Sequence, residues 1–566
     1  MKTVDRHHLQ RFWAIAAPYW RHEEKLKAWG LLALLVLLLL GQTRFAVLFN
    51  EQTGEFTSAL AARDEERFWV AIRYCLGLLL FAVPVYAFYY FVRDKLGIFW
   101  RRWLTGRFLD SYFAQRHYYE LNANAAIDNP DQRIAEDINT FTQRTLYFLL
   151  ILIGAVLQLF AFSLVLWDIS RVLVYFLVFY AIFGTTVTLA VFGKPLIGLN
   201  FLQLKREADF RFGMVRIREN AESIAFYRGE AQESQQVRKR FTAAFDNYSR
   251  LIRSQLFLNL FQYAYGLLTI VLPSAIIAGD VLSGELEVGA AVQAAGAFAA
   301  VLSAISVVIE NFEGLSRFAA GIDRLNTFSR VLAAKPACRA GGSPIESAEG
   351  PRLVLERVTL QTPGGERTLV RNLSVAIKPG EGLMIVGESG SGKSSLLRAI
   401  AGLWYCGSGR IVRPRPEDIL FLPQQPYMIL GSLRSQLLYP QQERPVPDAE
   451  LLRLLERVNL PDLAERFGGL DEERDWEKVL SIGEQQRLAF ARVLLTRPRY
   501  VMLDEATSAL DAANEESLYR QLAASQTTLV SVAHRASILK YHQQVLELYG
   551  EGEWQLHPAE GYGFRH

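Results

Sequence analysis

The residues of this 566-residue chain that predict chemistry most clearly lie between 387 and 395, in the run GESGSGKSS. Glycines let a loop fold so that its backbone N–H groups surround phosphate oxygens, and a lysine adds positive charge for the terminal phosphates. A hydroxyl directly after that lysine suits Mg²⁺. The predicted nucleotide-binding residues are therefore Gly387, Glu388, Ser389, Gly390, Ser391, Gly392, Lys393, Ser394 and Ser395, with Ser394 also at the metal.

Three further groups are candidates for catalysis, and two of them follow predicted strands. YVMLDE places Asp504 and Glu505 after an apolar strand, so that Asp504 suits the Mg²⁺ shell and Glu505 suits a general base for the attacking water. His534 follows the predicted strand TTLVSVA and is placed to contact a γ-phosphate. Gln424 in FLPQQPY can reach both Mg²⁺ and the attacking water. The predicted catalytic residues are Glu505, His534 and Gln424, and the predicted metal ligands are Ser394, Gln424 and Asp504.

A second anion site is predicted where LSIGEQQR opens a helix. Serine and glycine at a helix N-terminus suit a bound anion, although the same pattern alone equally describes a capped helix without a ligand. Since one chain already has one phosphate-binding loop, a second anion site is explained if it completes the nucleotide site of another copy of the chain. The residues assigned to it are Leu480, Ser481, Ile482, Gly483 and Glu484.

The elements that position these residues fall into an α/β part and an apolar part. A strand (GLMIV) enters the 387–395 loop and a helix (LLRAIAGLW) leaves it, which is the context that a P-loop requires. We expect an α/β P-loop NTPase domain over residues 353–566, a linker rich in Ala, Gly, Pro and Ser over 333–352, and a membrane domain over 1–332.

Six long apolar runs in the first part each suffice to cross a bilayer as a helix. They cover about 28–48, 69–92, 147–168, 172–193, 255–278 and 288–310. Lys and Arg concentrate before the first run, between the second and third, and between the fourth and fifth, which predicts that both termini are cytosolic. The two long charged connections are expected to be helical extensions of the spans. A net charge of +3 argues against a nucleic-acid-binding protein.

Taken together, the motifs resemble those of the ATP-binding cassette (ABC) family. GESGSGKSS looks like Walker A, Pro423-Gln424 like the Q-loop, LSIGEQQR like the signature motif and VMLDE like Walker B. SALD, ending in Asp511, is similar to the D-loop, and His534 to the switch histidine. In the membrane part, FNEQTGEFTSAL, NPDQRI at 129–134, EADFR and ENAESIAFYRGE resemble subfamily D transporters and their bacterial relatives. The chain departs from the pattern at Thr362, where many cassettes place an aromatic residue, and at Ile482 and Glu484.

This resemblance implies a half-transporter: an all-α, six-span membrane domain of exporter type, joined to an ATP-binding cassette and assembled as a domain-swapped homodimer. ATP and Mg²⁺ are the implied cofactors, and Leu480–Glu484 and Asp511 would face the ATP of the partner subunit. A bacterial inner membrane is the implied location. The implied activity is ATP-driven transport of a bulky hydrophilic solute such as cobalamin, or of a peptide. Fatty acid or fatty acyl-CoA transport, and an ATP-gated channel or regulatory membrane ATPase, remain alternatives.

Overall fold

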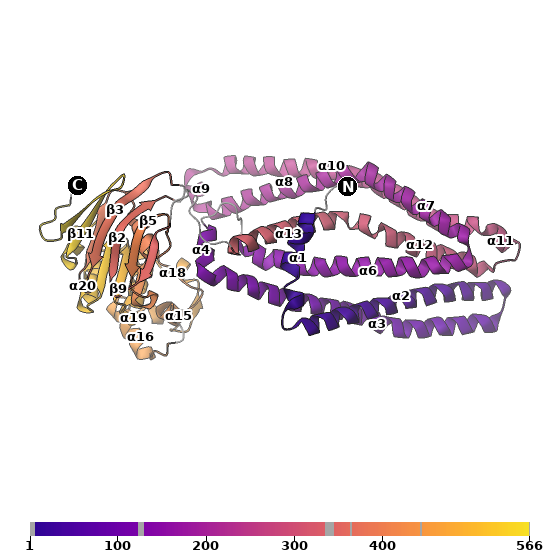
Figure 1. Cartoon of the computed structure of the whole chain (residues 1–566), viewed down its shortest axis with the longest axis horizontal. Coiled ribbons are helices and arrows are strands. Elements are labelled where there is room, and N and C mark those ends of the chain that lie inside the picture. Colours follow the sequence, from indigo (N-terminus) through magenta and orange to yellow (C-terminus); the bar gives the residue numbers. More distant parts are fainter. Residues whose placement is uncertain (1–5, 123–129, 334–343, 363–364, 442–443, 565–566) are drawn as a thin grey trace. The chain divides into compact units, whose positions relative to one another are not determined.

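The computed structural model describes residues 6–122, 130–333, 344–362, 365–441 and 444–564 (Figure 1). The chain divides into two compact units, Met1–Ala334 and Lys335–His566. The first is helical throughout its described residues and the second combines sheets and helices, which is the fold class predicted from the sequence.

The first unit consists of helices. They are α1 (Arg6–Ala16), η1 (Tyr19–Arg21), α2 (Lys25–Ala62), α3 (Glu65–Phe113), η2 (Ala114–Arg116), α4 (His117–Asn122), α5 (Pro130–Gln132), η3 (Arg133–Asp137), α6 (Ile138–Ile169), α7 (Arg171–Val187), η4 (Thr188–Gly193), α8 (Lys194–Glu219), α9 (Ala221–Tyr227), α10 (Glu230–Ile276), α11 (Ala278–Leu282), α12 (Val288–Glu310) and α13 (Phe312–Ala333).

Six helical stretches in the described residues are long and apolar enough to cross a membrane, and each overlaps one predicted span. They are Lys25–Ala62, Glu65–Leu121, Pro130–Ile169, Arg171–Glu219, Glu230–Ile276 and Val288–Val307. Where they are described, the charged connections are largely helical, as expected: α3 continues to Phe113, and α10 begins at Glu230, well before its apolar run. The chain is therefore an integral, multi-pass membrane protein.

The motif FNEQTGEFTSAL, at residues 49–60 after the first predicted span, joins α2 to α12. Asn50 Nδ2 donates to the carbonyl oxygen of Gln293 at 3.1 Å, and the Gly289 N–H donates to Ser58 Oγ at 3.0 Å. A Cβ on Gly289 would lie in contact with the carbonyl oxygen of Gly54, so the two backbones approach as closely as small residues allow. The residue types of this motif alone did not indicate its role. In the structure it holds the first and last spans together.

The described residues of the second unit form three sheets and their covering helices. Its strands are β1 (Glu346–Glu349), β2 (Leu353–Gln361), β3 (Thr368–Ile377), β4 (Leu383–Gly387), β5 (Gly407–Arg413), β6 (Ile419–Leu422), β7 (Gly431–Ser432), β8 (Glu473–Arg474), β9 (Tyr500–Asp504), β10 (Thr528–Val532), β11 (Gln544–Gly550) and β12 (Glu553–Pro558). Its helices are α14 (Lys393–Ile400), η5 (Pro416–Asp418), α15 (Leu433–Leu438), α16 (Asp448–Arg457), α17 (Leu463–Arg466), α18 (Trp476–Val479), α19 (Ile482–Thr496), α20 (Ala512–Ala524) and η6 (Ala536–Tyr541).

The main sheet has the strand order β12-β11-β4-β10-β9-β6, and every pair from β11 to β6 is parallel. Val532 of β10 pairs with Asp504 of β9 and with Ile385 of β4, and Leu422 of β6 pairs with Leu503. Parallel neighbours end at the same edge of a sheet, where α/β proteins bind ligands. The residues that follow β4, β6, β9 and β10 therefore gather at one edge.

The linker predicted over 333–352 is only partly described, since residues 334–343 lie outside the described residues. Its C-terminal part contains β1, which pairs in parallel with β5 from Glu346↔Arg410 to Glu349↔Arg413. The small sheet β1-β5-β2-β3 thus begins inside the predicted linker, before the domain boundary predicted at residue 353. In the membrane part, Asn129 at the start of NPDQRI also lies outside the described residues.

Candidate nucleotide-binding and hydrolysis site

The phosphate loop leaves the central strand β4 in a conformation that requires glycine. Gly387, Gly390 and Gly392 have φ angles of 144°, 82° and 104°, which side-chain-bearing residues rarely adopt. A Cβ on Gly387 would also lie in contact with the carbonyl oxygen of Leu548. The loop then runs into α14, whose first residue is Lys393, so the helix N-terminus points its free N–H groups into the loop.

The Lys393 ammonium lies inside this loop. Its Nζ donates to the carbonyl oxygens of Gly387 at 2.7 Å and Glu388 at 2.9 Å, and the side chain is buried. Burial lowers the pKa of Lys393, and the nearby carboxylates of Glu505 and Asp504 oppose that shift. Within the described residues, the buried Ser391 Oγ has no hydrogen-bond partner. A cation held at the loop centre beside an unpaired hydroxyl suits an anion with several oxygens.

Ser394 and Asp504 meet at the end of β9. Ser394 Oγ donates to Asp504 Oδ1 at 3.0 Å, and burial raises the pKa of Asp504, although the Ser394 hydrogen bond opposes that shift. These hard oxygen atoms are of the kind that Mg²⁺ binds through one or two protein groups together with phosphate and water. The described residues form no cluster of three or more His, Cys, Asp or Glu that could hold a metal ion.

Glu505 is the point where three predicted catalytic residues come together. Gln424 Nε2 donates to Glu505 Oε2 at 3.0 Å, and His534 Nε2 lies 3.3 Å from Glu505 Oε1. Glu505 itself has a left-handed φ of 49°, and its N–H donates to the carbonyl oxygen of Val532 at 3.0 Å. A non-glycine residue held in this region marks a position fixed by its surroundings, as is common in active sites. The arrangement fixes one carboxylate between an amide and an imidazole.

The signature segment forms a capping box at the start of α19. Ser481 Oγ donates to Glu484 Oε2 at 2.9 Å and accepts from the Glu484 N–H at 3.3 Å, while the Ser481 N–H donates to Glu484 Oε2 at 2.8 Å. Burial tends to raise the pKa of Glu484, but hydrogen bonds from Arg466 and Ser481 outweigh it and leave this pKa lowered. Leu480 is buried, Ile482 is exposed, and Gly483 packs against the Ala509 carbonyl.

Asp511 caps the following helix α20. Its Oδ1 accepts from the Asn514 N–H at 2.8 Å and its Oδ2 accepts from Asn514 Nδ2 at 2.6 Å. Across the described residues, no hydrogen bond runs from Leu480–Gly483 or from Asp511 to the phosphate loop at 387–395. The predicted site residues thus form two groups, one around the P-loop and one around the signature helix.

Gln486 is a residue that the sequence reasoning missed. This fully buried amide donates from Nε2 to the Gln424 carbonyl at 3.0 Å and to Ser508 Oγ at 3.3 Å, and its Oε1 accepts from the Ala509 N–H at 3.1 Å. It therefore ties the Q-loop backbone to the D-loop. The available signal was a pair of glutamines directly before the apolar part of the helix, where a buried amide has to be paired.

Two buried charged residues, Arg492 and Glu515, bind the segments that follow the predicted catalytic residues. Arg492 on α19 donates to the carbonyl oxygens of Gln436 at 2.7 Å and Tyr427 at 2.9 Å, and burial lowers its pKa to about 10. Glu515 on α20 accepts from Thr507 at 2.6 Å and from Arg535, the residue after the predicted switch histidine, at 3.4 Å. Arg492 thus anchors the segment after Gln424, and Glu515 joins the segment after Glu505 to the one after His534.

Comparison with known proteins agrees with both halves of the chain. A family model for ABC transporter transmembrane region 2 matches residues 19–278, and one for ABC transporter matches residues 370–508. An uncharacterized ABC transporter ATP-binding protein of Synechocystis is 47% identical over 540 residues, which cover 94% of this chain and 82% of that protein. The chloroplastic ABC transporter D family member 2 of Arabidopsis thaliana is 38% identical, with 95% and 86% covered.

A third relative is the lysosomal cobalamin transporter ABCD4 of Homo sapiens, which is 32% identical over 597 residues, covering 98% of this chain and 96% of that protein. Such identity along nearly the whole length of both chains confirms the family predicted from the motifs. The six apolar helices, the P-loop site at the sheet edge and these relatives together establish that the chain belongs to the ABC transporter family, as an ATP-binding and ATP-hydrolysing half-transporter.

Proposed function

We propose that two copies of this chain form a homodimer in which each ATP lies between the P-loop of one subunit and the signature helix of the other. The observation that carries this proposal is the separation of the two anion-binding groups, since residues 480–483 make no described hydrogen bond to residues 387–395. A C2 arrangement lets each subunit supply what the other lacks. For Ser481 to bind the partner's phosphate, its hydroxyl proton has to turn away from Glu484.

The membrane unit supports an assembly of two chains. Phe212 on α8 and Phe241, Phe245 and Tyr248 on α10 are exposed, although they lie on charged stretches outside the apolar spans. Exposed aromatic side chains gathered on one element mark protein interfaces. Figure 1 shows α8 and α10 running side by side as a long pair. We propose that this pair crosses to the other subunit, which gives the domain-swapped arrangement of exporter-type transporters.

Within each shared site, the proposed roles follow from the contacts. Lys393 and the N–H groups of the loop bind the β- and γ-phosphates, and Ser394, Gln424 and Asp504 hold Mg²⁺, which would neutralise phosphate charge when bound. Glu505 orients the attacking water and accepts its proton, and the hydrogen bond from Gln424 together with the close contact of His534 aims the carboxylate. Asp511, Leu480, Ile482 and Glu484 support the face turned toward the partner's nucleotide.

ATP binding would close the two cassettes and hydrolysis would release them, so that the spans alternate between two states of different nucleotide affinity. We place both termini and the cassettes in the cytosol of a bacterial cell, with the spans in the inner membrane. The distribution of Lys and Arg among the connections supports this orientation.

For the cargo we propose a bulky solute, with cobalamin as the first compound to test, because one relative over nearly the full length is named as a cobalamin transporter. A peptide belongs to the same class, and fatty acid or fatty acyl-CoA is the alternative.

Proteoliposomes with the cassettes facing outward test this function. We expect ATP added outside to drive accumulation of one of these compounds above its external concentration, and Lys393→Ala to abolish both ATP binding and accumulation. Movement that only follows the concentration gradient would instead indicate an ATP-gated channel, and full accumulation by Lys393→Ala would overturn the proposed engine.

A further inference from the structure

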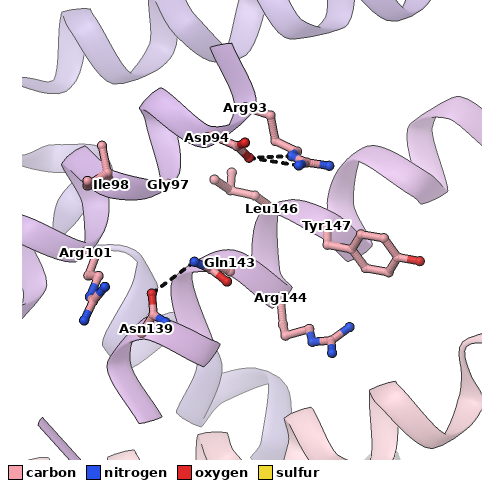
Figure 2. Close-up of a pocket in the computed structure, with 10 residues that line it drawn as sticks. All are labelled: Arg93, Asp94, Gly97, Ile98, Arg101, Asn139, Gln143, Arg144, Leu146 and Tyr147. Atoms are coloured by element: carbon pink, nitrogen blue, oxygen red, sulfur yellow. Dashed lines mark hydrogen bonds and ion pairs between the residues drawn. The ribbon is translucent and has the colours of Figure 1, made fainter. Parts of the chain in front are cut away.

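A groove of about 540 Å³ lies between α3 and α6 in the membrane unit (Figure 2). Its walls come from residues 93–101 of α3 and 139–147 of α6. The buried Gly97 and Leu146 lie where the two helices meet, and the open side carries polar and charged side chains. No residue of this groove belongs to the nucleotide site.

The groove is strongly basic. Arg93, Arg101 and Arg144 line it against the single carboxylate of Asp94, which leaves a net charge of +2. Arg93 is paired with Asp94 at 2.9 Å. Arg101 and Arg144 form no ion pair with any described acidic residue; Arg101 has only a long contact, 3.4 Å, to the carbonyl oxygen of Ala135. Arg101 and Arg144 therefore have no described acidic partner, and Arg93, whose pair with Asp94 uses only two of its three guanidinium nitrogens, keeps N–H donors for an anion.

Two of these arginine side chains are placed so that one anion can contact both. Figure 2 shows Arg93 from α3 and Arg144 from α6 extending to the same side of the helix pair, with the Tyr147 ring on that side as well. Arg144 lies 5.8 Å from the centre of that ring, and Tyr147 is fixed by a 2.9 Å hydrogen bond to Asn311 Oδ1. Guanidinium groups match the oxygens of a phosphate-type anion in a two-point fork.

The position of the groove along the helices indicates what kind of molecule carries the anion. In α3 the apolar run ends at Val92 and is followed by Arg93, while in α6 the apolar run begins at Leu146, just after Arg144. The groove therefore lies at the boundary between the hydrocarbon layer and water. Basic pockets between spanning helices at this depth bind anionic headgroups. The exposed Ile98 adds apolar surface beside the charges.

We propose that this groove binds the phosphate-type headgroup of an anionic amphiphile, whose apolar chain lies along α3 and α6 in the bilayer. The headgroup contacts Arg144 and Arg93, with Arg101 at the other end of the groove. The amphiphile is either a lipid of the surrounding membrane or a molecule that arrives from the cytosol. This site is independent of the nucleotide site, and its test needs no ATP.

Calorimetric titration of the full-length protein in phosphatidylcholine nanodiscs tests the proposal. Dodecyl phosphate is expected to bind, and inorganic phosphate is expected to bind at least tenfold more weakly because it lacks the chain. Discs that contain phosphatidic acid distinguish the two sources. Competition by phosphatidic acid identifies a membrane lipid as the occupant, and binding unaffected by it identifies an amphiphile from the cytosol. Absence of any dodecyl phosphate binding overturns the proposal.

Variants locate the binding in the groove. Arg144→Gln and Arg93→Gln are expected to weaken dodecyl phosphate binding about tenfold or more, since each removes a charge-assisted contact. Arg144→Lys keeps the charge without the fork and is expected to fall between wild type and Arg144→Gln. Arg102→Gln is the matched control, because Arg102 lies next to Arg101 on α3, is exposed and does not line the groove.

The control should bind within twofold of wild type. Equal weakening by Arg102→Gln would mean unspecific attraction to positive charge, and unchanged binding by Arg144→Gln would place the ligand elsewhere; either result overturns the proposal. Loss of dimer mass in Arg144→Gln without loss of binding would also overturn it, because the groove would then be a contact between subunits. Monodisperse elution and an unchanged unfolding midpoint establish that each variant is folded.

Discussion

Replacing Gln486 with methionine tests whether the Q-loop and D-loop act as one unit. The substitution keeps the length of the side chain and removes three hydrogen bonds, to Gln424, Ser508 and Ala509. The side chain is fully buried, so water cannot replace the lost partners. Each such bond contributes about 0.5–1.5 kcal/mol net, and a buried group left unpaired costs about 1–3 kcal/mol. We therefore expect Gln486→Met to reduce the free energy of unfolding by about 2–4 kcal/mol.

The effect on turnover should exceed the effect on nucleotide affinity. Gln486 does not contact the P-loop directly, but it fixes the backbone of Gln424, whose side chain aims Glu505. Because a displacement of about 1 Å in a positioning group can cost about 100-fold in rate, we expect kcat to fall at least about tenfold. The affinity for a non-hydrolysable ATP analogue should stay within about threefold, since Lys393 and its loop are unchanged.

The assay combines thermal unfolding, ATPase kinetics and analogue binding on purified full-length protein. Gln521→Met is the matched control, because it applies the same substitution to a partly exposed glutamine of α20 whose described side-chain hydrogen bonds are both to Arg457. The control should change neither stability nor kcat appreciably. Wild-type kcat in Gln486→Met, or a loss of analogue binding as large as the loss of kcat, would refute the proposed link between the loops.

Two further predictions concern the same domain. Glu505→Gln preserves the shape of the side chain without its basicity and is expected to lower ATP hydrolysis about 100-fold or more while ATP still binds; steady-state turnover within a few-fold of wild type would assign the base to another residue. His542 is buried between Ile538 and Ser531, and burial lowers its pKa to about 4 from the ordinary 6.5. Below pH 6.5 the unfolded chain therefore binds a proton on His542 that the folded chain does not bind. The free energy of unfolding should fall by about 2 kcal/mol between pH 6.5 and 5. An equally steep fall of the free energy of unfolding with pH in His542→Gln would contradict this.

The sequence predicted the fold well where one physical signal dominates. Each of the six apolar runs lies in a long helix, because hydrocarbon leaves the backbone no alternative to internal hydrogen bonds. The phosphate loop, Asp504, Glu505, Gln424 and His534 meet at one sheet edge, because all of them follow parallel strands. These contacts depend on the order of the strands in the sheet, and the order of the short motifs along the chain indicates that strand order.

Features that depend on contacts between distant parts of the chain could not be predicted from the sequence. Glu484 was assigned to the second anion site and noted as a departure from the family pattern, whereas it closes a capping box with Ser481 and pairs with Arg466 at 2.6 Å. Gln486 was not singled out, because its partners lie 62 and 22 residues away along the chain. Strand β1 inside the predicted linker has a polar sequence, ESAE, and is held by its pairing with β5 rather than by an apolar pattern.

The sharing of each ATP site between two subunits is tested most directly by counting nucleotides in a mixed dimer. Lys393→Ala and Ser481→Ala subunits carry different affinity tags, and the heterodimer is purified through both before vanadate traps the nucleotide. In a shared arrangement, both mutations fall in one site and the other site is intact, so one nucleotide should be trapped per heterodimer while each parent homodimer traps none. A heterodimer that traps none, as its parents do, or one that traps two, would contradict a site built from both chains.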